Sequence, residues 1–181
     1  IGLRDVTTQR GTATGNQSYT GAVTFNSDYL TNGGNFTVTG NTTLRENTTV
    51  TTAGGNIGFT GTINGTAGTP DETLALSAGA GGIDLQGDVG AATPLGELTA
   101  VGATIGLQDV TTRRGTATGN QSYTGAVTFN SDYRTNGGNF TVTGNTTLRD
   151  NTTVATTGST ADGDITFAGT IEGTEETSDE T

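Results

Sequence analysis

Two short stretches decide the fold of this chain: Gly34-Asn35-Phe36-Thr37-Val38-Thr39-Gly40 and Ile57-Gly58-Phe59-Thr60-Gly61-Thr62-Ile63. In each stretch, two apolar residues are separated by a single residue. This alternation is typical of a strand with one buried face, because successive side chains point to opposite sides of a strand. Clusters rich in Asn and Gly lie between such pairs and supply the positive φ angles that corners need. The pattern predicts short β-strands joined by tight turns.

The same apolar pairs recur along the chain with a regular period. Many of them follow one another at a nearly constant interval, as from Ile1 to Val23 and from Phe36 to Ile57. This period predicts an all-β parallel β-helix, or β-solenoid, with about 20–22 residues per coil and two or three strands in each. Tandem β-sandwich domains are the alternative, but they would need longer alternating runs and fewer turn glycines. We expect the core to contain Val23, Phe25, Phe36, Val38, Ile57, Phe59, Val127, Phe129, Phe140, Val142, Ile165 and Phe167.

The chain also contains a long internal repeat. Residues 1–50 match residues 105–154 except at Arg4/Gln108, Gln9/Arg113, Leu30/Arg134 and Glu46/Asp150. After an insertion at Ser159–Asp162, the match resumes with Ile57 aligned to Ile165. The repeat is therefore 104 residues long and should form about five coils. We expect residues 1–104 to be the first copy and 105–181 a second, incomplete copy, in one continuous solenoid that extends beyond both ends of this sequence.

Composition excludes several functions. The 181 residues include no Cys, no His and no Lys, and the formal net charge is −11. Without His or Cys, the commonest general base and the thiolate metal ligands are absent. The acidic balance disfavours nucleic acid, because phosphate binding needs a basic surface. No apolar run approaches the roughly 20 residues of a membrane-spanning helix. We expect no nucleic-acid partner, no membrane insertion and no enzymatic activity.

The composition and spacing of the repeats resemble those of a known group of proteins. The stretch Thr14-Gly15-Asn16-Gln17-Ser18-Tyr19-Thr20-Gly21-Ala22-Val23-Thr24-Phe25 continues to Gly34–Gly40, and a second copy runs from Thr118 to Phe129. This Thr/Gly-rich pattern is similar to the repeats of filamentous-haemagglutinin-like and autotransporter-adhesin-like bacterial surface proteins. The resemblance implies a right-handed parallel β-helix, export to the bacterial cell surface, and a role in adhesion or in an extracellular filament.

Candidate ligand sites in the sequence are few. Asp84 and Asp88, and also Asp162 and Asp164, are weak candidates for calcium, which needs six to eight oxygen ligands. Solvated turn residues are the favoured interpretation for all four, and we expect no cofactor. Tyr19, Tyr29, Tyr123 and Tyr133 could form a platform that stacks on sugars or on a partner chain, although corner or core positions are favoured.

Thr-x-Thr pairs raise a further possibility, an ice-binding face. The pairs at Thr12/Thr14, Thr37/Thr39 and Thr60/Thr62 are unequally spaced, and no pair follows between Thr62 and Thr104. This spacing predicts solvated strand residues instead. The function that we expect is a structural, adhesive segment, with self-association by covalent continuation or end-to-end stacking and a possible surface receptor or glycan as partner. The alternative is a ligand-binding module for calcium, glycan or ice.

Overall fold

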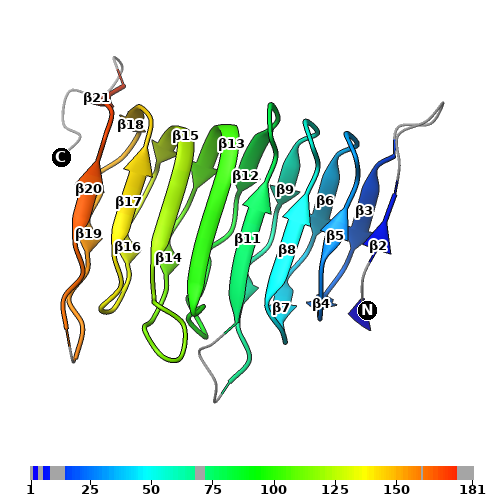
Figure 1. Cartoon of the computed structure of the whole chain (residues 1–181), viewed down its shortest axis with the longest axis horizontal. Helices are drawn as coiled ribbons and strands as arrows, with labels where there is room; N and C mark the ends of the chain where they lie inside the picture. Colours follow the sequence, from blue (N-terminus) through cyan, green and yellow to red (C-terminus); the bar gives the residue numbers. More distant parts are fainter. Residues whose placement is uncertain (1, 4–5, 9–14, 68–71, 160, 175–181) are drawn as a thin grey trace.

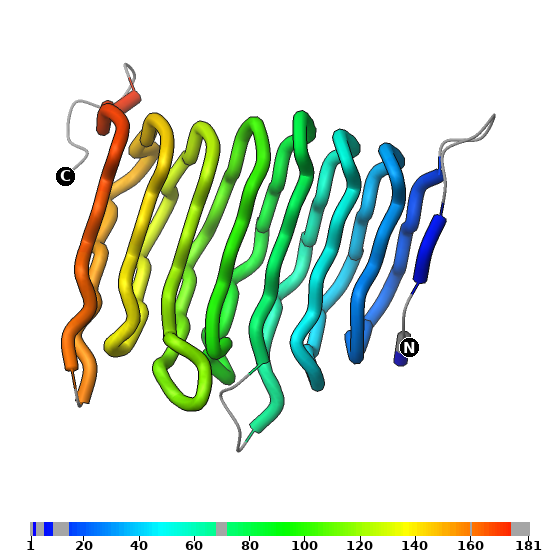
Figure 2. Tube along the Cα trace, viewed as in Figure 1, coloured from blue at the N-terminus to red at the C-terminus, as the bar shows by residue number. Residues whose placement is uncertain are grey.

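The computed structural model describes residues 2–3, 6–8, 15–67, 72–159 and 161–174. Within them the chain forms 21 β-strands and no helix. Every strand pair is parallel, and successive coils follow one another along the longest axis of the molecule (Figures 1 and 2). The protein is therefore a parallel β-solenoid of about seven turns. This arrangement excludes the β-sandwich alternative, whose sheets are antiparallel.

Each coil visits three faces in the same order, which we number 1, 2 and 3. Face 1 contains β1 (Gly2–Leu3), β4 (Val23–Phe25), β7 (Thr42–Leu44), β10 (Ile63–Asn64), β14 (Val110–Thr111), β16 (Tyr133–Arg134) and β19 (Val154–Ala155). The isolated bridges of Val89 to Ile63 and to Val110 connect β10 to β14. Face 1 is thus continuous along the described coils.

Faces 2 and 3 form longer ladders. Face 2 contains β2 (Val6–Thr7), β5 (Tyr29–Leu30), β8 (Thr48–Thr51), β11 (Thr73–Ser77), the first halves of β13 (Glu97–Leu107) and β15 (Gln121–Phe129), β17 (Phe140–Thr143) and β20 (Ile165–Phe167). Face 3 contains β3 (Gln17–Thr20), β6 (Phe36–Thr39), β9 (Ile57–Phe59), β12 (Gly82–Leu85), the second halves of β13 and β15, β18 (Thr146–Leu148) and β21 (Ile171–Gly173). Strands β13 and β15 run around the corner between the two faces.

The core is the bore of the solenoid, as the alternation predicts. Ten of the twelve expected core residues are at most 2% exposed. The other two, Ile165 and Phe167, belong to β20 in the last described coil. Ile165 is aligned with Phe140 but is 49% exposed, whereas its counterpart Ile57 is 1% exposed under Ile83. Burial of these positions therefore depends on the coil that follows.

Coil length varies more than the sequence period indicates. The corner that precedes face 3 recurs after 19 residues from Asn16 to Asn35, but after 26 residues from Asn56 to Gly82. The strand ladders stay intact across both intervals. Likewise, after the insertion at Ser159–Asp162, of which Thr160 lies outside the described residues, Ile165 keeps its alignment with Phe140. The ladder therefore accommodates the insertion, since corner loops lengthen at little entropic cost.

The 104-residue repeat does not correspond to a whole number of coils. Phe25 lies on face 1, but its counterpart Phe129 lies on face 3; Phe36 lies on face 3, but Phe140 lies on face 2. Following the ladders from one copy to the next gives fourteen faces, or four and two-thirds coils, where the sequence period suggested about five. The second copy is therefore rotated by one-third of a turn relative to the first.

Candidate functional site

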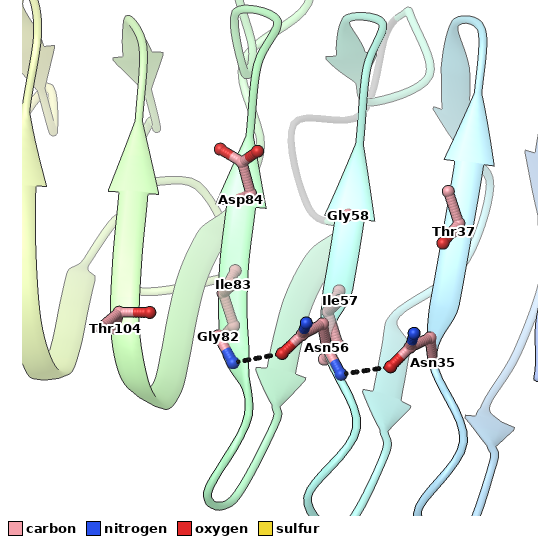
Figure 3. Close-up of a pocket in the computed structure, with 9 residues that line it drawn as sticks. All are labelled: Asn35, Thr37, Asn56, Ile57, Gly58, Gly82, Ile83, Asp84 and Thr104. Carbon is pink, nitrogen blue, oxygen red and sulfur yellow. Dashed lines mark hydrogen bonds between the residues drawn. The ribbon is translucent and has the colours of Figure 1, made fainter.

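A shallow groove of about 440 Å³ crosses the outer side of face 3 (Figure 3). Thr37, Gly58 and Asp84 are aligned in one outward column, while the residues that precede them point into the core. Gly58 has no side chain, and the space where a Cβ would lie contains no other atom within 4 Å. The groove is therefore the gap between a threonine and a carboxylate. Its lining is Asn35, Thr37, Asn56, Ile57, Gly58, Gly82, Ile83, Asp84 and Thr104.

One edge of the groove is an asparagine ladder. The Asn35 Oδ1 accepts a hydrogen bond from the Asn56 backbone N–H at 2.9 Å, and the Asn56 Oδ1 accepts one from the Gly82 N–H at 2.9 Å (Figure 3). The second copy repeats this pattern, because the Asn139 Oδ1 accepts from the Asp164 N–H at 2.9 Å. Each amide satisfies a backbone donor of the next coil at a corner. These asparagines therefore have a structural role.

Asp84 supplies the only carboxylate among the residues that line the groove. Its side chain is exposed and accepts a hydrogen bond from the Gln86 Nε2 at 2.7 Å. The residues aligned with it in the two adjacent coils are Gly58 and Gly106, so neither neighbour brings a second carboxylate. Asp88 lies past the next corner, half-buried, and its backbone carbonyl accepts from the Ile63 N–H at 3.0 Å. The structure does not bring this pair together into a multi-oxygen site.

The second aspartate pair lies in the corner before β20. The Asp162 Oδ1 accepts a hydrogen bond from the Gly158 N–H at 3.1 Å, which closes the inserted turn. Asp164 contributes its backbone to the ladder, since its carbonyl accepts from the Phe140 N–H at 2.8 Å. Throughout the part of the chain that the structure describes, no three acidic side chains gather in a group that could hold a metal ion. The arrangement thus offers no support for a calcium site.

The tyrosines are core residues, not a surface platform. Tyr29, Tyr123 and Tyr133 are at most 1% exposed, and Tyr19 is half-buried against the core. The Tyr123 hydroxyl donates to the Gln121 Oε1 at 3.0 Å, and the Gln121 Nε2 donates to the carbonyls of Val110 and Arg134 at 3.2 and 2.9 Å. Burial raises the pKa of Tyr123 well above its ordinary value, and burial likewise raises that of Tyr133. Both rings therefore stay neutral in the fold.

Face 2 contains a surface that the sequence pattern does not reveal. Two aligned columns of its outward side chains, over β8, β11, β13, β15, β17 and β20, form a surface that we call the hydroxyl face; a third, shorter column beside them contains Thr73 and Glu97. The hydroxyl face comprises Thr49, Thr51, Ala75, Ser77, Thr99, Val101, Ser122, Thr124, Thr141, Thr143 and Thr166. None of these eleven residues is ionisable, although the whole chain has a net charge of −11. The carboxylate of Glu97 borders them, and its Oε1 accepts a hydrogen bond from the Thr99 Oγ1 at 3.5 Å.

The hydroxyl face is built from residues of both copies. Ser122, Thr124, Thr141 and Thr143 join Thr49 and Thr51 only because the second copy is rotated by one face. The expected rows behave differently: Thr37 and Thr39 lie on face 3 beside Gly58, Thr62 lies at a corner, and Thr12 and Thr14 lie outside the described residues. A search for aligned pairs that allowed their separation to vary from coil to coil could have found the hydroxyl face.

Comparisons of the chain with protein-family models, with curated proteins and with solved structures gave no match. Among the residues that the structure describes, no helix has the length and apolar character needed to cross a membrane.

Proposed function

We propose that the chain is a structural, adhesive segment of a large repetitive extracellular surface protein or filament of bacteria, and that it is not catalytic. In this role it acts as a rigid spacer along which surface features are displayed. Its partners are further copies of itself, by covalent continuation or end-to-end stacking, and a receptor or glycan on another surface. The resemblance of its Thr/Gly-rich repeats to those of filamentous-haemagglutinin-like proteins supports this proposal.

One observation carries the proposal. The boundary between the two copies, at Thr104 and Ile105, falls inside the continuous strand β13. Leu98 and Ala100 of the first copy and Ile105 and Leu107 of the second are all buried in the same bore. The copies therefore share one strand and one core, and cannot move as separate domains. Repetition of such a unit lengthens a rod without adding a hinge.

The length of longer arrays tests the rod. Each additional 104-residue copy should add about 22 Å, because coils stack at roughly 4.8 Å. Small-angle X-ray scattering on the full chain extended by one, two and three copies would measure this increment. A radius of gyration that grows as for a flexible chain, instead of linearly with copy number, would contradict the proposal.

Cell attachment tests the adhesive role. The same arrays, displayed on a non-adherent bacterium, should increase attachment to cultured cells or glycan-coated surfaces with copy number, through avidity. Arrays in which Phe36 and its equivalent in each later copy, Phe140 in the second, are replaced by alanine provide a control. These changes weaken the core and leave the outer residues unchanged. Attachment no greater than that of the empty host at every copy number would rule out adhesion to the surfaces tested.

A second candidate function, a ligand-binding module for ice, is favoured by the hydroxyl face. Its side chains are spaced about 4.8 Å across coils and about 6.7 Å along each strand. Threonine is stiff at χ1, so the hydroxyls and methyls form a rigid and regular array. A matching partner must be neutral, flat and repeating, and must both donate and accept hydrogen bonds. Stacking sugars would need an aromatic platform, whereas the described tyrosines and phenylalanines lie in the core or pack against it.

The rotation between copies supplies a matched pair of variants for this candidate. Thr143 lies on the hydroxyl face, whereas its counterpart Thr39 is an exposed residue of face 3. If face 2 binds ice, Thr143→Lys should lower thermal hysteresis at least several-fold, and Thr39→Lys should preserve it. An inactive wild-type chain, or equal losses in the two variants, would exclude ice. Calcium titration with thermal melting checks the metal alternative, because saturating ligand at 100 times Kd would add about 2.7 kcal/mol.

A further inference from the structure

The one-face shift between the copies applies to every equivalent pair whose ladder is defined. Val6 and Tyr29 lie on face 2, whereas Val110 and Tyr133 lie on face 1. Leu44 lies on face 1, whereas Leu148 lies on face 3. Each strand of the second copy therefore lies on a different face from its counterpart. That face is the one occupied, in the first copy, by the strand just before the counterpart.

Local packing survives this shift almost unchanged. The ring centroids of Phe25 and Tyr29 are 4.5 Å apart, and those of Phe129 and Tyr133 are 4.3 Å apart. The Tyr19–Phe36 and Tyr123–Phe140 separations are 5.6 and 5.7 Å. The buried glutamine also keeps its bonds, since the Gln17 Nε2 donates to the carbonyls of Val6 and Leu30 as Gln121 does to those of Val110 and Arg134.

The corner glycines shift together with the strands. Gly21 and Gly40 stack at the corner between faces 3 and 1, whereas Gly125 and Gly144 stack at the corner between faces 2 and 3. A Cβ at Gly40 or Gly144 would collide with the backbone of the glycine one coil below. Because strands, core contacts and corners all move as one set, the three faces are equivalent environments for this sequence.

We infer that the 104-residue unit acts as a screw operator, so that a tandem array displays every outward segment on its three faces in turn. Successive copies rise by about 22 Å and rotate by one-third of a turn, and a fourth copy faces the same way as the first, about 67 Å along the axis. This inference rests on the proposed rod and specifies how the rod meets its partner. The partner is an extended surface that is contacted by one side of the fibre at a time.

The arrangement has a consequence for attachment. A fibre that lies on a flat surface engages one copy in three, whichever way it is rolled about its axis. Copies placed a whole number of coils apart would instead confine all binding segments to one side. The screw thus makes attachment independent of roll and spaces the contacts evenly.

The test uses the absence of cysteine from the chain, which allows single labels. Thr43 points outward on face 1, and its counterpart Thr147 points outward on face 3. Arg134 lies in the same coil as Thr147 but in the outward column of face 1 that contains Thr43. An array of four copies with Thr43→Cys and its equivalents, biotinylated and bound to monovalent streptavidin, is imaged by electron microscopy. The 181-residue chain with Thr43→Cys and Arg134→Cys is the control, and its two tags should lie on one side.

Tags at three azimuths, with the first and fourth superposed in end-on projection, are the expected result. Tags along a single edge of a straight fibre would overturn the inference and leave the rod intact. A compact or flexible particle would instead refute the rod and, with it, the inference. Attachment of the same arrays to cells is a separate readout, so its failure removes adhesion without affecting the tag pattern.

Discussion

Phe36 and Phe140 hold the same place in the two copies of the repeat, yet Phe36 is paired with Ile57 on face 3 and Phe140 with Ile165 on face 2. Both rings are 0% exposed and make matching aromatic contacts. The same sequence therefore builds the same core from two different sides of the solenoid.

Truncation of either ring should be costly in a similar way. Phe140→Ala and Phe36→Ala should each lower the free energy of unfolding by about 3–5 kcal/mol, as expected for a buried phenylalanine. Chemical denaturation followed by circular dichroism measures the loss. Thr141→Ala, one residue away on the outer surface, is the control and should change stability by no more than about 0.5 kcal/mol. A difference of more than about 2 kcal/mol between the two phenylalanine variants would mean that the two environments are not equivalent.

The buried glutamine should matter more than the tyrosine that it binds. Gln121→Ala leaves the Tyr123 hydroxyl and the carbonyls of Val110 and Arg134 without their partner. Each such buried polar group costs about 1–3 kcal/mol, and Gln121→Ala leaves three of them, whereas Tyr123→Phe leaves one, the Gln121 Oε1. Thermal melting of the two variants should rank Gln121→Ala as the less stable. The opposite order would show that water replaces the lost side chain.

Two glycines should respond in opposite ways to alanine. Gly144 has a φ of 134°, and a Cβ there would overlap the Gly125 backbone, so Gly144→Ala should destabilise the fold by about 1–3 kcal/mol. Gly58 faces the groove with no atom within 4 Å of a Cβ position, so Gly58→Ala should be tolerated. Urea denaturation of both variants measures the contrast. Equal tolerance at the two sites would argue against close stacking of the corners.

Stability should fall in alkali because of the buried tyrosines. Burial raises the pKa of Tyr123 and Tyr133 above the ordinary 10.0. The folded state then keeps protons that the unfolded state releases, so the stabilisation is complete below pH 10 and is lost as the pH rises above it. Tyrosinate absorbance from these two rings should appear together with unfolding, not before it. Tyr133→Phe should move the alkaline transition to higher pH, and ionisation of Tyr123 and Tyr133 without unfolding would disprove their burial.

The candidate sites differ in how far the sequence could predict them. The sequence favours corner or core positions for the tyrosines, and Tyr29, Tyr123 and Tyr133 are at most 1% exposed. A fixed sequence period did not reveal the groove at Gly58 or the hydroxyl face, because each needs residues from separate coils of unequal length to be placed side by side. Thr49 and Ala75 are farther apart along the chain than Ser122 and Thr141, yet both pairs are direct neighbours on face 2.

The sequence by itself determined the strands, their inward and outward sides and the glycine corners, because these follow from alternation and from backbone conformations within each short segment. It also determined that the two copies fold alike locally. Only the tertiary structure decided which face each strand joins. That choice depends on the accumulated length of the corners, which varies from coil to coil, and on hydrogen bonds to strands a whole coil away along the chain. A pattern within one short segment does not contain the accumulated length of the corners. The one-third turn between Phe36 and Phe140 therefore appears only in the assembled solenoid.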